Sequence, residues 1–334
     1  MGNKSSAAPT TQTVLDEEVF KGHCMQVMIG IDFSKSNEWT GKETFKGKSL
    51  HELPDRLSER NPYENAILFV SHILEKPAIQ GAFDELIPCF GFGDSVTKSD
   101  AIFSFMPLDR DGVPKRKGYK PKHLCTRYRD LCNTLEFEEP TSYAPIIQYA
   151  ASEAKHSDLP TNLLIILTDG RLTMGQGHTT NTNLALEYAA KELDIVILVV
   201  GDGPHDILES SLAPWSKKNV LVAPFKGTPE QEDKVLQWLT NRAMERRGTK
   251  HEESVDMPFK PVLVHPPKPI EQKVKAPPPE WVNESIPFQQ EGELEYFSHG
   301  EQAYFPPPPQ PEIPQQPRPT TLPTSSVSQP DARV

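Results

Sequence analysis

The stretch Ile29-Gly30-Ile31-Asp32-Phe33-Ser34-Lys35-Ser36-Asn37 joins an apolar run to a cluster of oxygen-bearing side chains. The run starts at Met25 and holds no charge before Asp32, which is typical of a buried strand in a parallel sheet. Ligands of open α/β sheets bind at the carboxyl ends of such strands. The carboxylate of Asp32 and the hydroxyls of Ser34 and Ser36 are hard oxygen donors, which suit Mg²⁺ or Mn²⁺ better than Zn²⁺ or copper.

This spacing by itself also fits an ordinary strand-to-loop turn, in which Asp and Ser side chains bond to nearby backbone N–H groups. Two distant segments favour the metal site instead. The apolar run Leu163–Thr168 ends in Asp169 and Gly170, so it predicts a second buried strand that finishes in an acid. The loop before a predicted helix carries Thr141, which offers a further hydroxyl.

The set Asp32, Ser34, Ser36, Thr141 and Asp169 resembles the metal-ion-dependent adhesion site of von Willebrand factor A domains. The sequence around these residues resembles the A domain of the copine family more closely still. This resemblance covers roughly residues 15 to 245. The matching blocks occur in copine order: Ile31-Asp32-Phe33-Ser34-Lys35-Ser36-Asn37, Asn61-Pro62-Tyr63-Glu64-Asn65-Ala66-Ile67, Phe90-Gly91-Phe92-Gly93, Pro140-Thr141-Ser142-Tyr143-Ala144-Pro145-Ile146-Ile147 and Thr168-Asp169-Gly170. The resemblance implies that these five residues hold Mg²⁺ or Mn²⁺ and that a partner's Asp or Glu completes the coordination.

Predicted strands and helices alternate along the chain, which indicates right-handed crossovers and a doubly wound, mostly parallel α/β sheet flanked by helices. This is also the von Willebrand factor A, Rossmann-like architecture that the resemblance implies. The segments that carry the prediction are strands at Met25–Ile31, Leu86–Phe90, Leu163–Thr168, Ile195–Val200 and Val220–Ala223, and helices after Asn61, at Tyr128–Leu135, after Pro145, at Asn183–Leu193 and at Glu230–Arg247.

Composition divides the chain into a disordered N-terminus (1–13), an A domain (14–248) and a disordered Pro-rich tail (249–334). Of the 34 prolines, 19 lie from Met257 onward, and such a segment cannot bury a core. The first residues, Met1-Gly2-Asn3-Lys4-Ser5-Ser6, fit an N-myristoylation pattern at Gly2 as well as an ordinary flexible terminus. Both interpretations stay open.

The sharpest feature of the tail is Phe305 followed by Pro306, Pro307, Pro308 and Pro309. Four successive prolines favour a polyproline II helix, the form that SH3, WW and EVH1 domains bind. The preceding aromatic resembles an EVH1 ligand, whereas an SH3 site more often has Arg or Lys beside the prolines. The alternative is one more Pro-rich segment without a dedicated partner.

Charge and cysteine content narrow the function classes. The formal net charge of −11 argues against nucleic-acid binding. Four cysteines without paired spacing predict reduced thiols and a cytoplasmic protein, peripheral at the membrane if Gly2 is acylated, with the nucleus left open. The segment from Arg110 to Arg129 holds eight Lys or Arg against one acid, which fits either a patch for anionic lipid or a solvated loop.

Enzymatic alternatives find less support, and no catalytic residue is predicted. The haloacid dehalogenase pattern of Mg²⁺-dependent hydrolases needs a second Asp two residues after Asp32, where Ser34 stands. Some copine-like plant proteins carry a RING domain and act as ubiquitin ligases, but a RING needs eight Cys or His ligands and the sequence from Glu252 contains no cysteine. The sequence therefore predicts a metal-dependent protein-binding adaptor, with a part in a ubiquitin-ligase pathway as the alternative.

Overall fold

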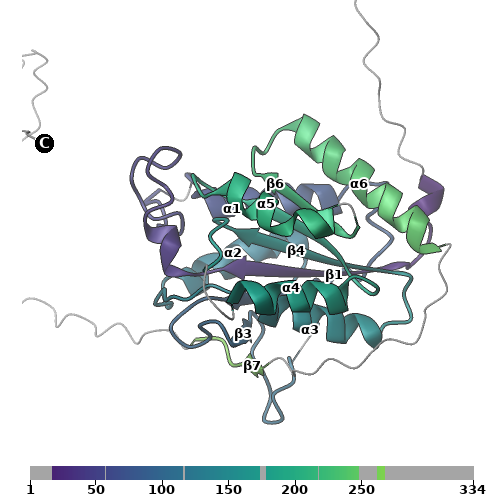
Figure 1. The fold of residues 1–334 in the computed structure, drawn as a ribbon, viewed down its shortest axis with the longest axis horizontal. Helices are drawn as coiled ribbons and strands as arrows, with labels where there is room; N and C mark the ends of the chain where they lie inside the picture. Colours follow the sequence, from purple (N-terminus) through teal and green to yellow (C-terminus); the bar gives the residue numbers. More distant parts are fainter. Residues whose placement is uncertain are drawn as a thin grey trace, which may run out of the picture. The chain divides into compact units, whose positions relative to one another are not determined.

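The computed structural model describes residues 17–56, 58–115, 117–173, 178–216, 218–247 and 262–267. Within them, seven strands form one sheet in the order β6-β5-β4-β1-β2-β3-β7 (Figure 1). Neighbouring strands are parallel except for β2 and β3, which are antiparallel. The strands are β1 (Met25–Asp32), β2 (Cys89–Phe92), β3 (Ala101–Ser104), β4 (Thr161–Thr168), β5 (Asp194–Val199), β6 (Val220–Pro224) and β7 (Val262–Val264).

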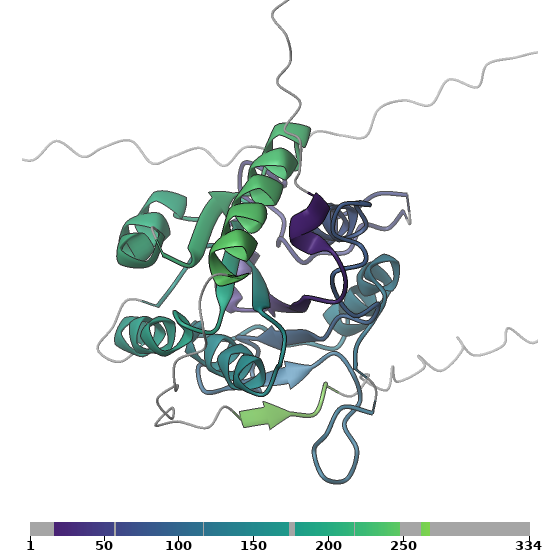
Figure 2. The same ribbon diagram turned by 90° about the vertical axis from the view of Figure 1, so that its right-hand side faces the viewer.

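Helices cover both faces of this sheet (Figure 2), as the alternating pattern of strands and helices predicts. One apolar cluster lies between the sheet and α1 (Pro62–Leu74), α2 (Pro121–Cys132) and α6 (Pro229–Arg247), and the other lies under α3 (Ala144–Lys155), α4 (His178–Ala189) and α5 (His205–Ser216). Two 3₁₀ turns, Glu17–Phe20 and Lys35–Glu38, complete the described elements. None of the described helices has the length and hydropathy needed to cross a membrane. The doubly wound, mostly parallel architecture is confirmed.

The start of α1 follows its sequence signals closely. The Asn61 side chain accepts the Glu64 N–H at 2.8 Å, and the Glu64 carboxylate accepts the Asn61 N–H at 2.8 Å, so both halves of a capping box form. Pro62 occupies the first helical position, where a missing N–H costs nothing. Glu64 is fully buried and also binds the guanidinium of Arg129, which ties α1 to α2.

Helix α6 is tied to the sheet by a buried ion cluster. Asp194 begins β5 and is fully buried. Its carboxylate accepts a hydrogen bond from Arg242 Nε at 2.8 Å and one from Arg246 Nη2 at 3.1 Å. Two guanidinium groups from successive turns of α6 therefore compensate one carboxylate in the core.

The basic segment from Arg110 to Arg129 differs from the prediction, because its second half is the helix α2 rather than a loop. Pro121 starts this helix at its first position, where a proline is tolerated. Four of its eight basic side chains have partners in the domain, which leaves less charge for a lipid surface. Lys117 pairs with Asp84 at 3.2 Å, Lys120 with Glu85, Arg129 with Glu64, and Arg127 donates to the Phe105 carbonyl at 2.9 Å.

Besides the two 3₁₀ turns, three elements have no counterpart in the sequence-based prediction: β3, α5 and β7. The last of them lies beyond the predicted domain boundary at residue 248. Val262, Leu263 and Val264 pair in register with Ala101, Ile102 and Phe103 of β3. The assignment of every residue after 248 to a tail is therefore wrong at β7, because this strand belongs to the sheet.

Candidate metal centre

The register of the sheet brings the two predicted acids together. Strands β1 and β4 are parallel neighbours, and Ile31 pairs with Leu167, so both strands end at the same edge. Asp32 Oδ1 accepts the Ser34 N–H at 2.8 Å, and Asp32 Oδ2 accepts the Thr168 hydroxyl at 2.6 Å. The loop after β1 and the end of β4 are thereby joined through one carboxylate.

The remaining predicted donors of the first loop point toward the same place. The hydroxyls of Ser34 and Ser36 lie 3.1 Å apart, and Ser36 also hydrogen-bonds to the Asp169 carboxylate. Asp169 accepts the Arg171 N–H at 2.8 Å and the Thr40 hydroxyl at 3.1 Å. Four of the five predicted residues therefore form one connected network.

Thr141, the fifth predicted residue, stands at the mouth of α3 and is buried. Its backbone is fixed by Thr173, whose hydroxyl accepts the Thr141 N–H at 2.7 Å and whose N–H donates to the Thr141 carbonyl at 3.1 Å. The Thr141 hydroxyl makes no hydrogen bond to another described residue, so it is available to a ligand.

The electrostatics of this network fit a cation. Asp32 and Asp169 are both fully buried, and neither forms an ion pair with a Lys or Arg among the described residues. Burial, and then the charge of Asp169, raise the pKa of Asp32 to about 7, and burial raises the pKa of Asp169 as well. The charge of Arg171 lowers the pKa of Asp169 in part without forming an ion pair with it. Two buried carboxylates with hydroxyl oxygens beside them are the donor set that Mg²⁺ or Mn²⁺ prefers.

His51 holds the loop after β1 in place through hydrogen bonds, and nothing in the sequence marks it for this role. Its Nε2 lies 2.8 Å from the Asp32 carbonyl oxygen, and its Nδ1 lies 2.7 Å from the Tyr128 hydroxyl. Since a carbonyl can only accept, Nε2 carries the proton and Nδ1 accepts from Tyr128. Burial lowers the pKa of His51 to about 3, so the ring is neutral, and it stacks on Tyr63 at 4.0 Å.

Gly93 allows the loop to approach the end of β2. Its φ of 83° lies in the left-handed region. A Cβ at this position would stand 3.0 Å from the Ser34 nitrogen and 3.2 Å from Asp32 Oδ1. A side chain at Gly93, the second glycine of the Phe90-Gly91-Phe92-Gly93 block, would therefore crowd the candidate metal site itself.

A groove of about 310 Å³ adjoins the centre on the side of α5. Thr141, a predicted metal ligand, lines this groove, and so does Gly170, which directly follows Asp169, so the groove adjoins the proposed centre. The apolar side of the groove includes Leu172 and Ile207, and the Ile207 side chain is 57% exposed. Arg171 also lines it and lies 6.0 Å above the ring of Trp39.

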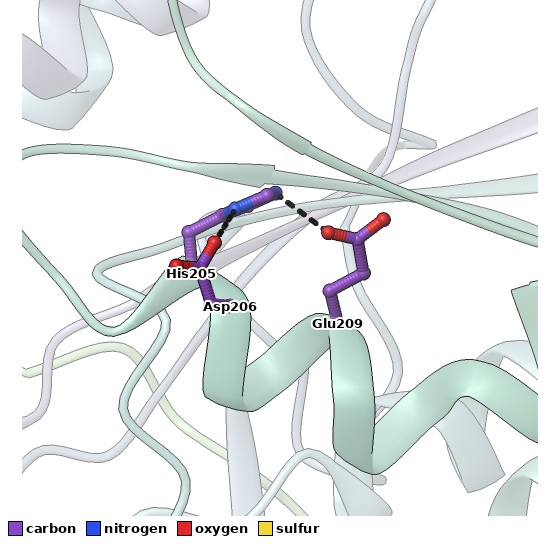
Figure 3. Close-up of side chains that lie close together, drawn as sticks. All are labelled: His205, Asp206 and Glu209. Carbon is purple, nitrogen blue, oxygen red and sulfur yellow. Dashed lines mark hydrogen bonds and ion pairs between the residues drawn. The ribbon is translucent and has the colours of Figure 1, made fainter.

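A second group of possible ligands occurs at the first turn of α5 (Figure 3). The ligand atoms of His205, Asp206 and Glu209 lie within 4.8 Å of one another, with His205 Nδ1 3.1 Å from Asp206 and Nε2 3.8 Å from Glu209. The two carboxylates are largely exposed, and acids at a helix N-terminus are favoured by the helix dipole alone. These contacts are explained without a metal ion.

Two sets of predicted functional residues lie outside the described residues. Gly2 is in the first set, and Phe305, Pro306, Pro307, Pro308 and Pro309 form the second. N-myristoylation and binding to EVH1 or SH3 domains stay predictions.

Comparison with known proteins places this geometry in a family context. The family model described as Copine matches residues 49–274, a range that includes Thr141 and Asp169 and begins after Ser36. The chain is similar to E3 ubiquitin-protein ligase RGLG3 of Arabidopsis thaliana, with 35% identity over 196 residues, 55% of this chain and 49% of that protein. It is 31% identical over 195 residues to Copine family protein 1 of Caenorhabditis elegans, covering 57% of this chain and 16% of that protein.

Among solved structures, the chain is similar to the von Willebrand factor type A protein from Catenulispora acidiphila. The two share 14% identity with a TM-score of 0.39, over 67% of this chain and 43% of that one. The chain spans about half the length, or less, of the curated relatives that it matches.

Proposed function

The chain belongs to the copine family, and we propose that its domain is a metal-dependent protein-binding module that takes Mg²⁺ or Mn²⁺ and binds acidic segments of partner proteins. Asp32, Ser34, Ser36, Thr141 and Asp169 are the residues proposed to hold the ion. The observation that carries the proposal is the pair of fully buried carboxylates, Asp32 and Asp169, at the rim of the sheet.

The chain's own residues give such a site its selectivity. The hydroxyls of Ser34 and Ser36 face the two carboxylates, and the Thr141 hydroxyl has no hydrogen-bond partner among the described residues, so the oxygens come from three segments. The bound cation supplies an open coordination position for a partner's Asp or Glu. The adjoining groove, with Leu172, Ile207 and Arg171, accepts the residues next to that acid.

A peptide selection on the full chain tests this function. A random peptide library panned in Mg²⁺ is expected to yield sequences that share an Asp or Glu, and chelation with EDTA should release them. The Thr141→Ala variant is expected to bind the selected peptides at least about tenfold more weakly, since it loses one donor at the rim and keeps the core intact. Peptides without an acid, or binding that persists in EDTA, would contradict the proposal.

A second candidate function is a part in a ubiquitin-ligase pathway, which is favoured by the similarity to five relatives named as E3 ubiquitin-protein ligases. These names describe proteins of which this chain matches about half or less. The four cysteines of the chain all lie at or before Cys132, so the sequence lacks the paired ligands of a RING. We propose that any such role is substrate binding rather than ubiquitin transfer.

A reconstituted reaction separates these two roles. The protein is mixed with ubiquitin, activating enzyme and a panel of conjugating enzymes. It is expected to produce no more polyubiquitin than a reaction from which the protein is left out. Transfer that depends on the chain would show a ligase activity and overturn this assignment.

Hydrolysis at the metal centre is not favoured by the geometry. His51 is the histidine in contact with the Asp32 loop, and both of its ring nitrogens are engaged in hydrogen bonds. It is fully enclosed and its pKa is lowered by burial, so it does not face a substrate as a general base.

A further inference from the structure

A pocket of about 510 Å³ opens at the opposite end of β1 from Asp32. Its lining includes Gln26 and Met28 of β1, and Tyr149 and Glu153 of α3. Gln26 stands six residues before Asp32 on the same strand, which separates the pocket from the metal centre by about 20 Å. The pocket is therefore a site of its own.

Glu153 is a carboxylate in this pocket that lacks an ion pair with a Lys or Arg among the described residues, although the nearby His156 lowers its pKa in part. It forms no hydrogen bond or ion pair with another described residue, and burial raises the pKa of its carboxyl. It lies in the last turn of α3, which ends at Lys155, and the C-terminal end of a helix carries a partial negative charge. The carboxylate and the helix end together make this wall attractive to a cation.

The floor of the pocket adds an acceptor and an aromatic surface. The Oε1 atom of Gln26 is buried and has no hydrogen-bond partner. A buried acceptor without a donor is costly, so a ligand that brings an N–H group gains from it. Tyr149 and Phe90 also line the pocket, with their ring centroids 4.8 Å apart, and such rings attract cations through their faces.

The basic residues at the rim are already engaged elsewhere. Lys117 lies 3.2 Å from Asp84 and His23 lies 3.7 Å from the same carboxylate. His156 directs Nδ1 to a carbonyl of its own helix at 2.7 Å. Asp84 is therefore paired, whereas Glu153 has only the partial compensation of the nearby His156.

We propose that this pocket binds the guanidinium group of an arginine side chain presented by a partner protein. A planar guanidinium donates to several acceptors at once and stacks on aromatic rings, so it can bond to Glu153 and Gln26 while it covers Tyr149. An ammonium group is a more strongly hydrated point charge and makes less use of the rings. The copine-family domain then carries an arginine pocket at one end of the sheet and the proposed acid-binding centre at the other.

Methyl signals of methionine give a local test on the full chain. Met25 and Met28 line the pocket, and the chain contains seven methionines, so ¹³C-methyl labelling yields few signals with two at the site. N-acetyl-arginine N-methylamide is expected to shift the Met25 and Met28 signals with a dissociation constant on the order of 1 mM, a reasonable value for one anchored side chain. N-acetyl-citrulline N-methylamide, its neutral isostere, is expected to leave them almost unchanged.

The Glu153→Gln variant separates charge from shape. It should weaken arginine binding by up to about fivefold, because an ion pair with an exposed carboxylate such as Glu153 contributes at most about 1 kcal/mol. The variant is expected to fold normally, since the Glu153 side chain forms no hydrogen bond or ion pair with another described residue, and Glu187→Gln on the exposed face of α4 serves as the matched control. Equal shifts from arginine and citrulline, unchanged affinity in Glu153→Gln, or shifts confined to other methionines would each overturn the proposal. These results do not depend on metal, so they leave the proposed function unaffected.

Discussion

The Asp32→Asn variant is expected to lose Mg²⁺ binding and to be more stable than the wild type when metal is absent. The wild-type carboxylate is fully buried beside Asp169, and its pKa of about 7 shows the cost of charging it there. Asparagine keeps the acceptor for the Ser34 N–H, and the Thr168 hydroxyl can turn to accept from the new amide. Titration calorimetry and thermal unfolding in EDTA measure the two effects.

The pH dependence of this gain has a definite sign. A carboxyl whose pKa is raised on folding contributes stability below its unfolded pKa near 4, and this stability is lost as the pH rises to about 7. The advantage of Asp32→Asn over the wild type in EDTA should therefore be small below pH 4, about 2 kcal/mol at pH 5 and on the order of 4 kcal/mol at pH 8. Saturating Mg²⁺ should reverse the order, since only the wild type gains binding free energy.

Asp206→Asn is the matched control, because it removes a carboxylate from the second group of possible ligands. It should leave Mg²⁺ binding and the pH profile unchanged. If Mg²⁺ binding is lost in Asp206→Asn and kept in Asp32→Asn, the ion binds at the start of α5 and the proposed centre is wrong.

Removing both guanidinium groups from Asp194 is expected to have the largest effect on stability. The double variant Arg242→Met/Arg246→Met leaves a fully buried carboxylate without a cation, which costs about 3–5 kcal/mol of unfolding free energy. Denaturant titration at pH 7 measures it. Arg56→Met, at an 80% exposed side chain, should change the free energy by less than about 0.5 kcal/mol.

Adding Asp194→Asn to the double variant tests the cause. If the uncompensated charge is responsible, the triple variant should recover most of the lost stability, because neutral replacements for buried ion clusters are often tolerated. A triple variant as unstable as the double one would show that the loss comes from packing of the arginine stems.

The sequence predicts most of the architecture because its strongest signals are local. An uncharged apolar run gives β1, and Asn61, Pro62 and Glu64 mark the start of α1 with a capping box that the structure contains. The prediction missed elements whose local sequence signals are weak. Helix α5 buries only Leu208 and Leu212 and has Pro214 inside it, so its apolar pattern is weak. The prolines and glycines around the start of α2 indicate a loop there instead of a helix.

The sequence predicts the residues of the metal-site motif, but it does not predict the residues that support them. The five predicted residues lie in three segments, and the structure joins four of them in one hydrogen-bond network. Thr168, Thr40 and His51 complete the site through partners up to 136 positions away. Thr168 ends β4, and Thr40 and His51 lie in a loop, so none of them has a local signal for such a role and only the folded structure identifies it.

Strand β7 also determines how the domain behaves as a separate molecule. Without it, the outer edge of β3 would expose unpaired N–H and C=O groups, and such an edge is a template for pairing with other chains. β7 covers this edge with only three residues, a length that itself offers little to a further strand. A fragment cut at residue 248 would thus be prone to aggregate, and one that keeps residues 262–267 would stay monomeric more readily.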